Sequence, residues 1–148
     1  EQEDKELGYV GKPKRVDAKL LKEIIKEDFI PVIVPMGLDE KGIAYNFIAD
    51  TAAGALARSI KSRRLMLLTD IDGVLDNNEK LISEINTTEA KELVNNETIH
   101  GGMIPKVKTC IDAINNGVRA VVILDGRKPH SILFELFSDK GAGTLIRK

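Results

Sequence analysis

Two short and continuously apolar runs, residues 65–69 and 120–124, most constrain what this chain can fold into. A strand that is apolar at successive positions, and not only at alternate ones, is typical of a parallel sheet with helices on both faces. Segments with apolar residues at helical spacing precede and follow both runs. This alternation predicts an α/β fold, a sandwich with a mostly parallel sheet flanked by helices.

The same periodicities divide the rest of the chain into elements. Helices are expected over 17–28, 48–60, 87–95, 103–116 and 131–137, and strands over 29–36, 43–47, 65–69, 120–124 and 144–146. Asp17 is the expected N-cap of the first helix, and Thr87 or Thr88 is expected near that of the third. The segment 29–36 is expected to be a buried strand, and 65–69 a central one. A length of 148 residues predicts a single domain over 1–148.

Composition limits the classes of partner. A formal net charge of −1 and a pI near 6.2 argue against nucleic acid or a membrane surface as the main partner. The sequence contains neither a membrane-length apolar run nor a signal peptide, which favours the cytoplasm, or the stroma of an organelle. Cys110 lies on the apolar stripe of a predicted helix and is expected to be a buried, inert thiol. One Cys and two His predict no protein metal site.

Residues 98–107, Thr-Ile-His-Gly-Gly-Met-Ile-Pro-Lys-Val, have the pattern of an anion site. Pro105 fits the first turn of a helix, where its missing N–H costs nothing. Lys106 then lies beside the helix N-terminus, whose N–H groups and dipole favour negative charge. An ordinary Gly-Gly turn with a solvated lysine is the alternative.

Further polar segments follow the expected strands, where open α/β sheets bind ligands. They are residues 46–50, 69–75 and 125–128. The chain has no G-x-x-x-x-G-K-[ST] motif, no G-x-G-x-x-G after a strand, and no context for a Ser-His-Asp triad. Carboxylates, glycine loops and a helix-terminal lysine are parts that phosphoryl transfer requires.

Four segments, in this order, carry a resemblance: 46–56 around Asn46-Phe-Ile-Ala-Asp50, 67–76 around Thr-Asp-Ile-Asp-Gly-Val, 101–107, and 123–127. Together they resemble the C-terminal half of the N-acetylglutamate kinases, in the amino acid kinase superfamily, from about Leu7 to Thr144. The resemblance implies ATP-dependent phosphorylation of the side-chain carboxylate of N-acetyl-L-glutamate in arginine biosynthesis. The alternatives are a kinase for a related carboxylate, such as N-acetyl-aminoadipate or carbamate, and a non-catalytic regulatory lobe that binds a nucleotide or effector.

The resemblance also implies roles for individual residues. Lys106 would stabilise the transferring phosphoryl group, Asp50 would hold the catalytic lysines, and Asn46 would bind acetylglutamate. The nucleotide would be bound by Thr69, Asp70, Ile71, Asp72, Gly73, Val74, Leu75, Thr98, Ile99, His100, Met103 and Lys106. Glu135, Gly141 and Gly143 fit an arginine effector site.

Mg²⁺ would arrive with the nucleotide phosphates. The chain is expected to be the ATP-binding lobe of a homo-oligomer, without the acetylglutamate-binding N-terminal lobe, and to be inactive alone.

Overall fold

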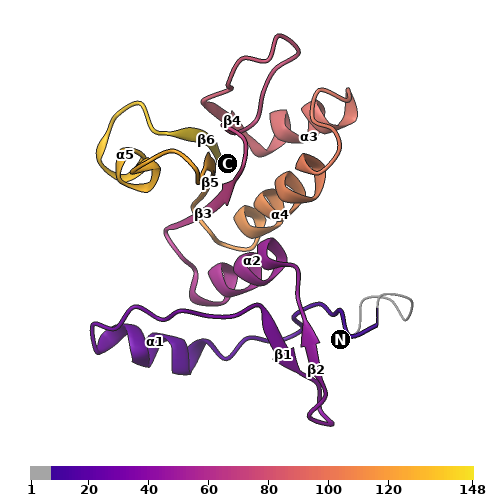
Figure 1. Ribbon diagram of the computed structural model, residues 1–148, viewed down its shortest axis with the longest axis vertical. Helices are drawn as coiled ribbons and strands as arrows, with labels where there is room; N and C mark the ends of the chain where they lie inside the picture. The colour runs from indigo at the N-terminus through magenta and orange to yellow at the C-terminus, as the bar shows by residue number, and fades with distance from the viewer. Residues whose placement is uncertain (1–7) are drawn as a thin grey trace. The chain divides into compact units, whose positions relative to one another are not determined.

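The computed structural model describes residues 8–148, which fall into two compact units (Figure 1). The first unit, which among the described residues covers 8–61, contains α1 (Ala18–Lys26), β1 (Met36–Leu38), β2 (Ala44–Asn46) and α2 (Ala49–Ile60). The second, residues 62–148, contains β3 (Arg64–Thr69), β4 (Glu84–Asn86), α3 (Thr87–Asn95), α4 (Met103–Asn115), β5 (Ala120–Asp125), α5 (Ser131–Phe137) and β6 (Gly143–Arg147). None of the helices in the described residues has the length and apolar character needed to span a membrane.

The second unit is built on a four-stranded sheet in the order β3-β5-β6-β4. β3 is parallel to β5 and β4 to β6, whereas β5 and β6 are antiparallel. The prediction of an α/β fold with a mostly parallel sheet is confirmed. The prediction that residues 65–69 form a central strand is wrong, because β3 is an edge strand and Leu68 is 46% exposed. An apolar run alone therefore shows neither that both faces of a strand are covered nor that the strand has neighbours on both sides.

The core of this unit lies between β5 and α4. Val121 to Leu124 in β5 are fully buried, and so are Val107 and Cys110 on the inner face of α4. The prediction of a buried Cys110 is therefore confirmed. In Figure 1, α3 and α4 lie on one side of the sheet and α5 on the other. The sheet is thus flanked by helices, as the alternation of elements predicts.

Local signals account for the helix boundaries. The Asp17 side chain accepts hydrogen bonds from the backbone N–H groups of Lys19 and Leu20, which confirms it as the N-cap of α1. The N-cap of α3 is Asn86, directly before Thr87, so the expected threonine does lie near this cap: the Asn86 side chain accepts from the Thr88 and Glu89 N–H groups, and the Glu89 carboxylate accepts from the Asn86 N–H. This reciprocal capping box satisfies more backbone donors than a threonine cap one residue later. β4, directly before it, has no counterpart among the predicted strands.

In the first unit, the prediction of a buried strand over 29–36 is wrong. Only Met36 belongs to a strand, and Ile30 and Val32 are 90% and 94% exposed. Pro31 and Pro35 lack the N–H that a sheet ladder requires. Within the described residues, the strand pairing of this unit joins β1 to β2, and Val10 to Asn46, so no neighbouring strand covers the run.

Candidate functional site

The site lies at the end of the sheet that contains the carboxyl ends of β3 and β5. These strands are parallel and in register from Arg64 opposite Ala120 to Thr69 opposite Asp125, so the loops that follow them start side by side. The Gly126 N–H donates to the Thr69 carbonyl oxygen at 2.9 Å, which joins the two loops at their origin. This is the edge at which open α/β sheets bind ligands.

Residues 70–75 leave β3 as a tightly held loop. Gly73 has a φ of +150°, in a region that L side chains rarely adopt. Val74 is 1% exposed, and its N–H donates to Thr144 Oγ1 at 2.8 Å. The Val74 carbonyl oxygen accepts from the Ile82 N–H at 2.9 Å. Both backbone groups of Val74 are therefore hydrogen-bonded, which fixes the path of the loop.

The second wall comes from the turn between α3 and α4. The Ile99 N–H donates to the Leu93 carbonyl oxygen at 2.8 Å, and the Ile99 side chain is only 2% exposed. Gly101 has a φ of +56°, and Gly102 is the N-cap of α4 without a side-chain hydrogen bond. Pro105 falls in the first turn of α4, as predicted, and the half-buried Lys106 follows it. The positive end of the helix dipole and the lysine charge meet at this turn.

These segments line one pocket of about 430 Å³. That volume lies within the range of small-molecule sites. Eleven of the twelve residues predicted to contact a nucleotide line it, all except Asp72, and Gly101 and Gly102 join them. Gly101 and Gly102 were not among the residues predicted to bind the nucleotide. Both belong to the anion motif predicted from residues 98–107, so the sequence did indicate them. The structure thus brings together two segments that lie about thirty residues apart in the chain.

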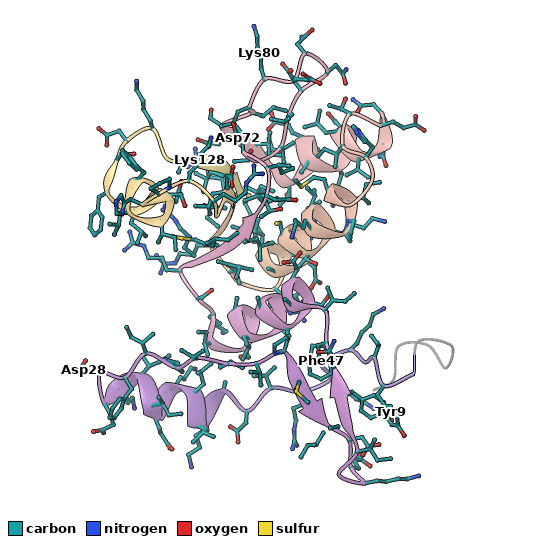
Figure 2. The ribbon with its side chains drawn as sticks, viewed as in Figure 1. Tyr9, Asp28, Phe47, Asp72, Lys80 and Lys128 are labelled. Carbon is teal, nitrogen blue, oxygen red and sulfur yellow. The ribbon has the colours of Figure 1, made fainter. Side chains whose placement is uncertain are left out.

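Two charged pairs involve the loops that follow β3 and β5. The Lys128 Nζ lies 2.7 Å from an Asp72 carboxylate oxygen, and Figure 2 shows these two side chains beside each other. Asp72 therefore points to the turn after β5 and not into the pocket. The buried carboxylate of Asp125 accepts two hydrogen bonds from the Arg127 guanidinium and one from the Arg127 N–H. Hydrogen bonding to Arg127 lowers the pKa of Asp125 to about 2, so this carboxylate is ionised at neutral pH.

Metal ligands are sparse in the part of the chain that the structure describes. Among residues 8–148, no group of three His, Cys, Asp or Glu side chains has the spacing to hold a metal ion. Asp70, at the pocket, accepts a hydrogen bond from the Thr69 hydroxyl at 3.2 Å. A cation at this site would need ligands from the bound molecule as well as from the protein.

Asn46 and Asp50 belong to the first unit, and the pocket belongs to the second. Asn46 ends β2; its N–H donates to the Tyr9 carbonyl oxygen, and its own carbonyl oxygen accepts from the Gly11 N–H. Asp50 is half-buried in the first turn of α2, whose N-cap is Ile48. An acidic residue in this turn stabilises the helix through its dipole. Their predicted roles stay predictions.

Glu135, Gly141 and Gly143 have structural partners. Glu135 is 8% exposed; one carboxylate oxygen lies 3.2 Å from Arg64 Nη1, and the other accepts from the Ala142 N–H at 3.0 Å. A Cβ on Gly141 would lie 2.8 Å from that second oxygen. Gly143 lies against the Ile123 carbonyl oxygen, so a Cβ there would collide with β5. The effector assignment stays a prediction, since each residue also serves the packing of this turn.

Comparisons with known proteins agree on one family. The model of the amino acid kinase family matches residues 1–125. The acetylglutamate kinase of Pelagibacter ubique (strain HTCC1062) is 56% identical over 147 residues, which cover 99% of this chain and 51% of that protein. The chain thus spans about half the length of the curated relatives it matches.

Solved structures show the same fold. A structure of N-acetylglutamate synthase from Neisseria gonorrhoeae, complexed with coenzyme A and L-arginine, matches 96% of this chain and 33% of that chain with a TM-score of 0.90 and 27% identity. Carbamate kinase from Giardia lamblia, bound to AMP-PNP, matches 94% of this chain and 47% of that chain with a TM-score of 0.71 and 24% identity.

Proposed function

This chain belongs to the amino acid kinase family, and we propose that it is the nucleotide-binding part of an acetylglutamate kinase. One observation carries the proposal: a single pocket is lined by the Asp70–Leu75 loop, the Gly101-Gly102 turn and Lys106. The 56% identity to an acetylglutamate kinase supports the choice of that activity within the family.

In this proposal the pocket receives ATP. Ile71, Val74, Leu75, Ile99 and Met103 supply apolar wall for the base and sugar. The phosphates lie at the Gly101-Gly102 turn, where the start of α4 and the Lys106 charge favour anions. Mg²⁺ is carried by the phosphate oxygens, since the described residues contain no acidic cluster that would hold it.

Phosphoryl transfer then runs from the γ-phosphate to the side-chain carboxylate of N-acetyl-L-glutamate. A carboxylate oxygen forms the new P–O bond as the bond to the ADP oxygen breaks, which gives an acyl phosphate and ADP. Negative charge on the transferring group is what Lys106 stabilises. We assign Asn46 to the acetylglutamate and Asp50 to the orientation of the catalytic lysines, both from the first unit.

Calorimetric titration with ATP and Mg²⁺ tests the nucleotide site. A charge-assisted contact is worth about 1.5–3 kcal/mol, so Lys106→Ala should weaken ATP binding by about 10- to 150-fold. Lys108→Ala is the matched control, because Lys108 lies on the same helix, is exposed and does not line the pocket. ATP binding that is equally affected by both substitutions would contradict a phosphate contact at Lys106. No ATP binding by the unsubstituted chain would contradict the proposed function.

The acceptor is tested on the whole enzyme that contains this chain, saturated with nucleotide. N-acetyl-L-glutamate should then bind with measurable heat, while carbamate and N-acetyl-aminoadipate should not, and Asn46→Ala should abolish the signal. Tighter binding of either competitor would favour the related-carboxylate alternative.

We also propose arginine as an effector that binds near Glu135. The support is the likeness to the synthase structure that holds L-arginine and the proximity of Gly141 to the Glu135 carboxylate. Because Arg64 already pairs with Glu135, arginine would have to share or displace that contact. An arginine titration without heat of binding would refute the site.

A further inference from the structure

One buried hydroxyl, on a strand that does not line the pocket, contacts the pocket wall. Thr144 in β6 is fully buried, and its Oγ1 accepts from the Val74 N–H at 2.8 Å and donates to the Ile82 carbonyl oxygen at 2.6 Å. The two partners lie on either side of the 75–81 turn. A single hydroxyl therefore satisfies the buried N–H of Val74 and the part-buried carbonyl oxygen of Ile82.

A second observation at the same place concerns Gly73. A Cβ on Gly73 would lie 2.6 Å from Thr144 Oγ1 and 3.0 Å from the Thr144 backbone nitrogen. The backbone of the pocket wall is thus in direct contact with Thr144, and the contact leaves no space for a side chain at residue 73.

Thr144 itself is held by the sheet. It pairs with Ile123 in the antiparallel ladder between β5 and β6, and both residues are fully buried. A loop that is hydrogen-bonded to such a residue is held in position by the sheet as well as by its own turn. Without the hydroxyl, the buried Val74 N–H would lose its partner, and relief of that cost requires the loop to move.

We propose that Thr144 is a positioning residue of the pocket, whose hydroxyl holds residues 73–75 where the nucleotide contacts them. The inference rests on the proposed nucleotide site. A loop that the sheet holds in place spares ATP binding the cost of ordering it.

The test compares ATP–Mg²⁺ affinity, by calorimetry on the whole chain, for Thr144→Val, Thr144→Ser and Val121→Thr. Thr144→Val keeps the volume but removes the hydroxyl, and should weaken binding by about fivefold or more. Thr144→Ser keeps the hydroxyl and loses a methyl group, and should bind within about twofold of the unsubstituted chain. Val121→Thr makes the converse exchange at a fully buried β5 position outside the pocket, and should also bind within about twofold.

Each other outcome overturns the inference. Unchanged affinity in Thr144→Val would show that the loop does not depend on the hydroxyl. Equal weakening in Thr144→Val and Val121→Thr would show that affinity follows overall stability. Failure of the unsubstituted chain to bind ATP would overturn the proposed function together with this inference, whereas normal binding with an unaffected Thr144→Val overturns the inference alone.

A measurement on the unsubstituted chain keeps the inference testable if Thr144→Val does not fold. Without nucleotide, the Val74 amide should exchange with solvent as slowly as amides of the β5–β6 ladder, because its hydrogen bond opens only with the sheet. Exchange of the Val74 amide at the rate of the exposed residues 70 and 71 would overturn the inference.

Discussion

Substitution of Gly73 by alanine should destabilise the second unit more than the same substitution at Gly101. Both glycines line the pocket and both have positive φ, +150° and +56°. They differ in what a Cβ would meet. At Gly101 nothing lies within 4 Å, whereas at Gly73 the Cβ would lie 2.6 Å from Thr144 Oγ1 and 2.8 Å from Leu81 Cδ1.

The expected loss of unfolding free energy has two sources, backbone strain and collision of the new Cβ with its neighbours. Forcing an L residue into the left-handed region costs about 1–2 kcal/mol, which is the whole expected cost of Gly101→Ala. For Gly73→Ala a strained backbone of about 1–3 kcal/mol adds to overpacking of about 1–3 kcal/mol. Leu81 can rotate away, but the Thr144 backbone nitrogen at 3.0 Å cannot, so the collision term remains. The expected loss for Gly73→Ala is therefore about 2–6 kcal/mol.

Urea unfolding followed by far-UV circular dichroism measures the difference. Both substitutions lie in the second unit, so the same transition reports both. We expect a lower midpoint for Gly73→Ala than for Gly101→Ala at an unchanged slope. A Gly101→Ala chain that is destabilised as much as Gly73→Ala would refute the reasoning, since backbone strain alone would then explain both.

Three further predictions concern other parts of the second unit. Because Arg127 depresses the pKa of Asp125 to about 2 from 3.8, the stabilisation from the ionised carboxylate is present above pH 3.8 and is lost as the pH falls toward 2. The difference in unfolding free energy between the unsubstituted chain and Asp125→Asn should thus be constant above about pH 5 and shrink below about pH 4 in urea titrations. A difference that stays constant over the whole pH range would contradict the stabilising interaction between Asp125 and Arg127. Asn86→Ala should lower the unfolding free energy by about 1 kcal/mol through loss of the α3 cap. The neighbouring substitution Thr87→Ala should lower it less, and a larger loss in Thr87→Ala than in Asn86→Ala would contradict Asn86 as the cap. Glu135→Ala should lower the unfolding free energy by about 1–3 kcal/mol, because the Ala142 N–H loses its acceptor. Glu135→Gln keeps a side-chain oxygen and should lower the unfolding free energy less. Equal losses in the two variants would show that the ion pair with Arg64, and not this hydrogen bond, carries the effect.

The pocket was largely predictable from the sequence because its parts are local motifs. Residues 69–75 follow an apolar strand, and residues 98–106 combine two glycines, a proline and a lysine at a helix start. The exception is Asp72, which the structure turns toward Lys128. Residues 72 and 128 are 56 positions apart in the chain, and no periodicity or turn signal relates them. Thr144 lay outside the predicted site for the same reason, since its contact with Val74 spans 70 positions.

The helices show what the sequence by itself determined. Asp17 caps α1, and α5 occupies residues 131–137 as predicted, because caps and helical periodicity act within a few neighbouring residues. Strands depend on partners that are distant in sequence. The tertiary structure alone decided that residues 29, 30 and 32–34 are exposed, that β3 is an edge strand, and that residues 84–86 pair with β6. A strand exists only where a second strand satisfies its backbone groups, and which segments meet is a property of the whole fold.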